Sequence, residues 1–171
     1  PLLGFEALLR WQHPKQGLLT PDLFLPLAEK TGLIIPIGNW VINEACRQLR
    51  EWHLQGHQDW SMAVNLSTLQ FEQPSLVKTV LDCLERHQVP PEMLILEVTE
   101  TTAMSNPDES VRVLTELTNA GVKASIDDFG TGYSSLLYLK RLPACELKID
   151  RAFVKELSGE SEDATIVSAI V

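Results

Sequence analysis

Five short apolar runs recur along the chain, at residues 2–9, 61–66, 93–98, 122–126 and 146–149. Each run is short enough for a β-strand and is bounded by turn or capping residues. Amphipathic patterns between most of them predict helices over residues 21–30, 39–56, 74–87 and 107–120. We expect Asn39 to cap the second helix and Gly121 to end the fourth. A last helical run covers residues 163–171.

This alternation of strand and helix predicts an α/β fold with parallel strands. Two architectures fit it, a barrel and an open doubly wound sheet. Polar side chains follow or end every strand run, and sites of both architectures lie at that end of the strands. Contributions from every strand favour the barrel, because an open sheet concentrates its ligands at one switch point. Since an eight-unit barrel takes about 250 residues, we expect roughly five or six units of one in these 171 residues, incomplete at both ends.

The net charge and the cysteines indicate which partners and which cellular compartment to expect. The net charge of −9 argues against a protein that coats nucleic acid by charge alone, and we expect no DNA partner. Cys46, Cys83 and Cys145 are far apart in sequence, which predicts buried thiols in a reducing compartment. No apolar stretch reaches the length of a bilayer span. A cytoplasmic domain is therefore expected, whether free or as the cytoplasmic part of a membrane-anchored protein.

Carboxylates near the ends of the predicted strands are the candidate metal-binding residues. Glu97 interrupts an apolar strand run, where an unpaired carboxylate is costly. Together with Glu6, Asn65 and Asp127 it could form an all-oxygen set, which suits Mg²⁺ or Mn²⁺. Adjacent strand residues point to opposite faces, so Asp127 and Asp128 can share a site only where the strand bends, and the nearby glycines permit a bend. The pair would fit a two-metal site that activates water against a phosphodiester, although it could also be a simple turn former.

Several motifs together carry a family resemblance. They are Glu6-Ala7-Leu8-Leu9-Arg10-Trp11, Asn65-Leu66-Ser67, Glu97-Val98-Thr99-Glu100, the run from Asp127 to Leu136, and Leu147-Lys148-Ile149-Asp150. In this order they resemble the EAL-domain cyclic di-GMP phosphodiesterases of bacteria. Glu-Ala-Leu alone would be a trivial match, but the motifs are jointly specific.

The resemblance implies a modified TIM-type (β/α)8 barrel that hydrolyses cyclic di-GMP to linear pGpG with Mg²⁺ or Mn²⁺, and is inhibited by Ca²⁺. By family resemblance the metal ligands would be Glu6, Asn65, Glu97, Asp127 and Asp128. Arg10, Leu8 and Asp150 would bind substrate. Lys148 would lie beside the attacking water, Asp150 would lie at the catalytic centre, and Glu100 would brace the loop that begins at Gly130.

The family's later Glu-Gly-Val-Glu-type motif and its late glutamine are not in the sequence, so we expect the 171 residues alone to be inactive. Two alternatives to an enzyme stay open, a receptor that binds cyclic di-GMP without turnover and a regulatory domain that acts by protein contact. The resemblance also implies a homodimer through the region of residues 128–139, and a sensory or GGDEF-type domain in the same polypeptide.

Overall fold

The computed structural model describes residues 2–130, 138 and 140–150. The predicted helix at 163–171 lies outside these residues. Five strands form one parallel sheet in the order β1-β4-β5-β6-β7. Their bounds are β1 Gly4–Ala7, β4 Ser61–Leu66, β5 Leu94–Thr99, β6 Lys123–Phe129 and β7 Glu146–Ile149. Every predicted strand run is confirmed, and the order never reverses as it would at the switch point of a doubly wound sheet. The curled sheet is that of a partial TIM-type barrel.

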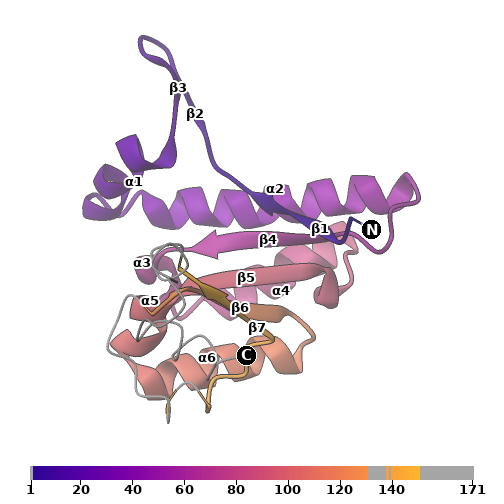
Figure 1. Cartoon of the computed structure of the whole chain (residues 1–171). Helices are drawn as coiled ribbons and strands as arrows, with labels where there is room; N and C mark the ends of the chain where they lie inside the picture. Colours follow the sequence, from indigo (N-terminus) through magenta and orange to yellow (C-terminus); the bar gives the residue numbers. More distant parts are fainter. Residues whose placement is uncertain (1, 131–137, 139, 151–171) are drawn as a thin grey trace, which may run out of the picture.

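Helices cover one face of this sheet, as Figure 1 shows. The longer ones are α1 Pro21–Lys30, α2 Ile34–Leu54, α4 Leu76–His87 and α6 Pro107–Asn119; short turns are α3 Thr68–Phe71, α5 Glu100–Ser105 and the 3-10 helix η1 Pro91–Met93. The core lies between the two layers. Leu94, Leu96 and Val98 of β5 are fully buried there, in one cluster with apolar residues of α2, α4 and α6. Alternate residues of β5 therefore point to the opposite face, away from the helices.

A β-hairpin that the sequence analysis did not predict projects from the sheet (Figure 1). It consists of β2 Trp11–His13 and β3 Gly17–Leu19, paired antiparallel. His13 Nδ1 accepts hydrogen bonds from the backbone N–H groups of Lys15 and Gln16, both at 3.1 Å, which closes the turn. Strands of three residues are too short to show a period-2 pattern, so the sequence signal was absent.

The predicted start of α2 was wrong, because the helix begins at Ile34 and Asn39 lies inside it. Pro36 is tolerated because it lies in the first turn, where its missing N–H would have no partner. Gly38 also lies within the helix, and its lack of a side chain leaves room for a side chain that packs against it. A Cβ atom there would lie 2.2 Å from Oε1 of the buried Gln70 side chain.

We expect Gly38→Ala to lower the free energy of unfolding by about 1 kcal/mol, because overpacking outweighs the gain in helix propensity. Urea unfolding of the variant measures this. Asn39→Ala is the matched control and should cost little, since Asn39 caps nothing. An increase in stability for Gly38→Ala, as in an unobstructed helix, would contradict the packing account.

The cysteines divide into two groups. Cys46 and Cys83 are buried as predicted, whereas Cys145 is exposed, with its thiol donating to the carbonyl of Ala124 at 3.2 Å. Cys145 precedes β7 at the edge of the described sheet, so burial of this thiol was wrongly predicted. Within the described part of the chain, no helix is long and apolar enough to cross a membrane.

Candidate functional site

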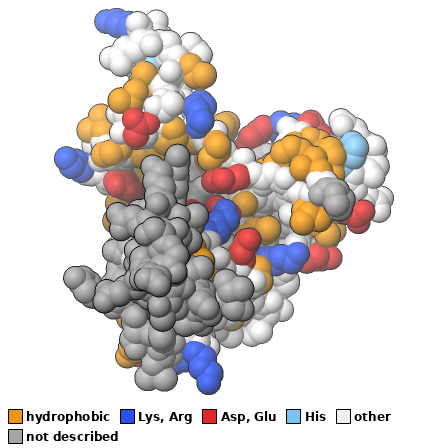
Figure 2. Space-filling model, viewed as in Figure 1, with side chains coloured by type: hydrophobic (Ala, Val, Ile, Leu, Met, Phe, Trp, Pro, Cys, Tyr) orange, Lys and Arg blue, Asp and Glu red, His pale blue; other side chains and the backbone are white. Residues whose placement is uncertain are grey.

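The sheet face opposite the helices gathers the predicted polar residues at the carboxyl ends of the strands. Asn65 of β4 is in register with Glu97 of β5, and Thr99 is in register with Asp127 of β6. Their neighbours Leu66, Val98 and Ile126 are buried in the core on the helix side, which fixes the polar residues on the inner face. Figure 2 shows acidic and basic side chains beside one another at the centre of this face.

Two hydrogen bonds link four of these side chains across the sheet. Asn65 Nδ2 donates to Glu6 Oε1 at 2.8 Å. The Lys148 ammonium on β7 donates to Glu97 Oε1 in an ion pair. These four residues therefore form two contacting pairs at the carboxyl ends of the strands, where the strand pattern predicted polar residues. We call this end of the sheet the carboxylate mouth.

Electrostatics at this mouth are dominated by negative charge. Burial raises the pKa of Glu97, and the carboxylates of Glu6 and Asp127 raise it further, against the opposing effect of Lys148. Burial lowers the pKa of Lys148, but the hydrogen bond and charge of Glu97, with Asp127 and Glu6, raise it by more. Lys148 is thus a cation held by several carboxylates, and the mouth favours positive charge.

The predicted bend at Asp127 and Asp128 is present. The register between β6 and β7 shifts between Ile126 and Phe129, which marks a bulge, and Asp128 has a left-handed φ of 53°. Aspartate tolerates this conformation better than most residues. Burial raises the pKa of Asp128, as do the charges of Asp127 and Asp150 and a hydrogen bond with Asp150. The bend thus places Asp128 within electrostatic reach of Asp127 and Asp150.

Glu100 lies behind this bend. It is the first residue of α5 and only 1% exposed. Its Oε2 accepts a hydrogen bond from the backbone N–H of Gly130 at 2.7 Å. A buried, charge-assisted bond of this kind fixes the start of the loop after β6 relative to α5.

The donor set fits a hard cation in its chemistry, because every candidate ligand offers oxygen. Glu97 Oε2 is buried and has no hydrogen-bond partner in the described structure. Among the described residues, however, no three His, Cys, Asp or Glu side chains lie close enough together to enclose an ion. The residue types therefore fit a hard cation, while the described side chains do not themselves enclose one.

Sequence analysis missed Ser125 of β6. It is fully buried, in register with Glu97, and its Oγ also lacks a partner among the described atoms. It shares the inner face with Asp127, two residues on. A serine inside an apolar strand was the available signal, but the residue type alone does not separate a functional hydroxyl from a satisfied core hydroxyl.

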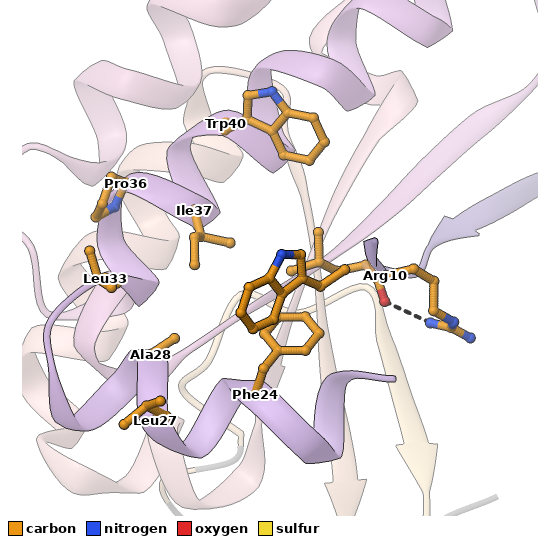
Figure 3. A pocket seen from close by; sticks show the side chains of 10 residues that line it. Arg10, Phe24, Leu27, Ala28, Leu33, Pro36, Ile37 and Trp40 are labelled. Atoms are coloured by element: carbon orange, nitrogen blue, oxygen red, sulfur yellow. Dashed lines mark hydrogen bonds between the residues drawn. The ribbon is translucent and has the colours of Figure 1, made fainter. Parts of the chain in front are cut away.

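Arg10 and Leu8, the predicted substrate contacts, lie between β1 and β2 and are exposed. Arg10 Nη1 donates to the carbonyl of its neighbour Leu9 at 2.7 Å, shown as a dashed line in Figure 3. No hydrogen bond or ion pair joins Arg10 to the carboxylates within the described residues. The structure thus leaves both side chains available to a ligand.

An apolar cavity of about 500 Å³ lies beside Arg10, between α1, α2 and the hairpin (Figure 3). Phe24, Ile37 and Trp40 are among its lining residues, and Arg10 is the one charged residue that lines it. It has no acid, base or oxygen ligand, so the chemistry belongs to the carboxylate mouth.

The family model described as "EAL domain" matches residues 1–171. The chain belongs to the EAL family. Its sequence is 64% identical over 171 residues to the bifunctional diguanylate cyclase/cyclic di-GMP phosphodiesterase MucR of Pseudomonas aeruginosa, and the match covers 100% of this chain and 25% of MucR. It is 47% identical over 166 residues to the cyclic di-GMP phosphodiesterase NbdA of the same species, covering 97% of this chain and 21% of NbdA. The EAL chain thus spans about a quarter of these curated relatives.

Solved EAL structures share the fold. A structure of PaMucR phosphodiesterase in complex with c-di-GMP superposes with a TM-score of 0.93 and 64% identity, over 99% of this chain and 69% of that one. The FimX EAL domain from Pseudomonas aeruginosa, bound to c-di-GMP, gives a TM-score of 0.85 at 28% identity, over 96% of this chain and 65% of the other. The EAL fold of the chain therefore agrees with that of relatives whose structures hold this dinucleotide.

Proposed function

We propose that this EAL domain hydrolyses cyclic di-GMP to linear pGpG by attack of water on one phosphodiester, assisted by two divalent cations. The observation that carries the proposal is the convergence of carboxylates from β1, β5 and β6 with Asn65 of β4 at one mouth, with the buried Glu97 Oε2 unpartnered in the described structure. The names of MucR and NbdA support the substrate.

We assign one cation, Mg²⁺ or Mn²⁺, to Glu6, Asn65, Glu97 and Asp127, and a second to Asp127 with Asp128. Bound there, the cations would offset the phosphate charge and lower the pKa of water. Asn65 holds Glu6 in place through its 2.8 Å hydrogen bond. Asp128 and Asp150 interact at the bulge, where they would border the substrate.

The remaining residues position the reactants. Lys148, held as a cation by Glu97, would lie beside the attacking water and the developing negative charge. Glu100 holds Gly130 through its hydrogen bond, and by family resemblance it would brace the loop that begins there. Arg10 would bind a phosphate oxygen, and Leu8 would contact the ligand beside it. Asp150 is assigned to the catalytic centre and to substrate contact.

The proposal extends to partners. A sensory or GGDEF-type domain in the same polypeptide is supported by the greater length and the diguanylate cyclase name of MucR. A homodimer through the region of residues 128–139 is proposed by family resemblance; residues 131–137 and 139 of that region lie outside the described structure.

Chromatographic separation of nucleotides tests the function. The full-length polypeptide that carries this chain is incubated with cyclic di-GMP and Mn²⁺, and we expect pGpG to accumulate. Cyclic di-GMP that binds, as measured by calorimetry, and yet persists through the incubation would contradict the enzyme and favour a receptor.

Removal of divalent cations is expected to abolish hydrolysis, since the proposal gives the cations the tasks of offsetting the phosphate charge and lowering the pKa of water. EDTA treatment followed by readdition measures the effect. Mg²⁺ or Mn²⁺ should restore turnover, whereas Ca²⁺ should compete without restoring it. Full activity in EDTA would contradict the metal assignment.

A further inference from the structure

Three threonine hydroxyls are joined in a row near the carboxyl ends of β4 and β5. Thr99, the last residue of β5, donates to Thr102 Oγ1 of α5 at 2.9 Å, and Thr99 Oγ1 accepts from the backbone N–H of Thr102 at 3.2 Å. The hydroxyl oxygen of Thr68 on α3 lies 2.6 Å from that of Thr102. The row therefore joins the segments that follow two neighbouring strands of the sheet.

Thr102 is the central member of this row and the buried one. Its side chain belongs to a residue that is 2% exposed, whereas Thr68 is exposed. Each hydroxyl carries a single hydrogen. Thr99 gives its hydrogen to Thr102, so the buried hydrogen of Thr102 goes to Thr68. Loss of the Thr102 hydroxyl would therefore break both side-chain links of the row.

The helix α5, which carries Thr102, also carries Glu100. Six residues are too few for a helix that is stable by itself, so α5 depends on its cap at Thr99 and on neighbouring elements. It packs against β5, β6 and α6, and the hydroxyl row adds a link to α3. From this place Glu100 accepts the hydrogen bond from the backbone N–H of Gly130, two residues beyond Asp128. The placement of α5 therefore determines where the bend after β6 is held.

We propose that Thr102 is a positioning residue for the cation site at the bend of β6, and that it acts by fixing α5 to α3 and thereby Glu100 to Gly130. The inference rests on the proposed function, in which Asp127 and Asp128 hold the second cation. Thr102 lies outside every motif of the sequence analysis. A purely structural hydroxyl contributes to stability alone, whereas a positioning hydroxyl also changes the order of the bend and its affinity for a cation.

Thr102→Val and Thr102→Ser test the proposal as a pair. Valine has nearly the shape of threonine but no hydroxyl, and serine keeps the hydroxyl and loses only the methyl group. The first measurement is hydrogen–deuterium exchange of the Gly130 amide, resolved to single residues in the metal-free, full-length polypeptide. Thr102→Val should speed this exchange by about 3- to 10-fold, the range that one hydrogen bond accounts for. Thr102→Ser should stay near the wild-type rate.

The second measurement is the affinity for Mn²⁺. Thr102→Val should raise the Kd of Mn²⁺, measured by calorimetry, and the Mn²⁺ concentration for half-maximal turnover. Both should rise by about tenfold, the low end of the range for groups that orient metal ligands. Thr102→Ser should restore both values.

The matched control is Thr118→Val on α6. The Thr118 hydroxyl donates to the carbonyl of Leu114 at 2.8 Å within its own helix. Its removal should lower stability to a similar extent and leave the Gly130 exchange and the Mn²⁺ affinity unchanged.

Wild-type Gly130 exchange and Mn²⁺ affinity in Thr102→Val, with only the stability lowered, would overturn the positioning role. If Thr102→Val does not fold, Thr68→Val decides, because it removes the same link from the exposed end and should also speed the Gly130 exchange. The exchange measurement separates the two proposals. Faster exchange in a polypeptide that does not hydrolyse cyclic di-GMP contradicts only the proposed function, and wild-type exchange in an active one contradicts only the positioning role.

Discussion

Asp127→Asn is expected to lower kcat for cyclic di-GMP by more than about 100-fold, because even the partners of metal ligands cost 10- to 100-fold when they are removed. Asp127 is the residue that we assign to both cations, and its charge acts on Glu97, Asp128 and Lys148. Asparagine keeps the size of the side chain and one oxygen but removes that charge. The loss should therefore appear in turnover, with little change in the free energy of unfolding.

Steady-state kinetics and metal titration measure this effect together. The variant should require a much higher Mn²⁺ concentration for any residual turnover. Asp82→Asn on α4 is the control, since Asp82 pairs with Lys78 on the outer surface. This variant should leave kcat and the metal requirement unchanged. A kcat near the wild-type value in Asp127→Asn would contradict the assignment of this residue to two cations.

Lys148→Met should also lower kcat by about 100-fold or more, because a preorganised cation beside developing charge contributes on this scale. Unlike the first change, it should also destabilise the fold, by about 1–3 kcal/mol, since Glu97 loses the donor to its Oε1 and stays 2% exposed. Methionine fills a similar volume, so the packing of β7 is retained.

The control for this pair is Lys78→Met on α4, whose side chain is 77% exposed. It should leave both kinetics and stability unchanged. Urea unfolding without divalent cations measures the cost of the lost ion pair, and initial rates with Mn²⁺ measure catalysis. Wild-type kcat in Lys148→Met would show that the amine is structural only.

The strands could be predicted because a strand that is buried beneath a layer of helices appears in the sequence as a short apolar run. Leu94, Leu96 and Val98 are buried on the helix side, as their spacing indicated. The inner-face positions of Glu97 and Asp127 followed from alternation alone. Their separation across the sheet did not, because it depends on register and strand order.

Tertiary contacts account for what the sequence analysis missed. The predicted cap Asn39 lies within α2, as does its neighbour Gly38, whose lack of a side chain leaves room for the Gln70 amide. Ser125 became a candidate only when the structure showed its buried hydroxyl without a partner in the described part of the chain. The hairpin of β2 and β3 has too few residues for a pattern.

Hydrolysis of cyclic di-GMP in water enriched in oxygen-18 tests the central claim most directly. The full-length polypeptide is mixed with cyclic di-GMP and Mn²⁺ under single-turnover conditions. The masses of the products are then measured by mass spectrometry. Attack of water at the carboxylate mouth predicts pGpG that carries one labelled oxygen on its new terminal phosphate. Unlabelled product, or cyclic di-GMP that stays bound and intact, would contradict the account.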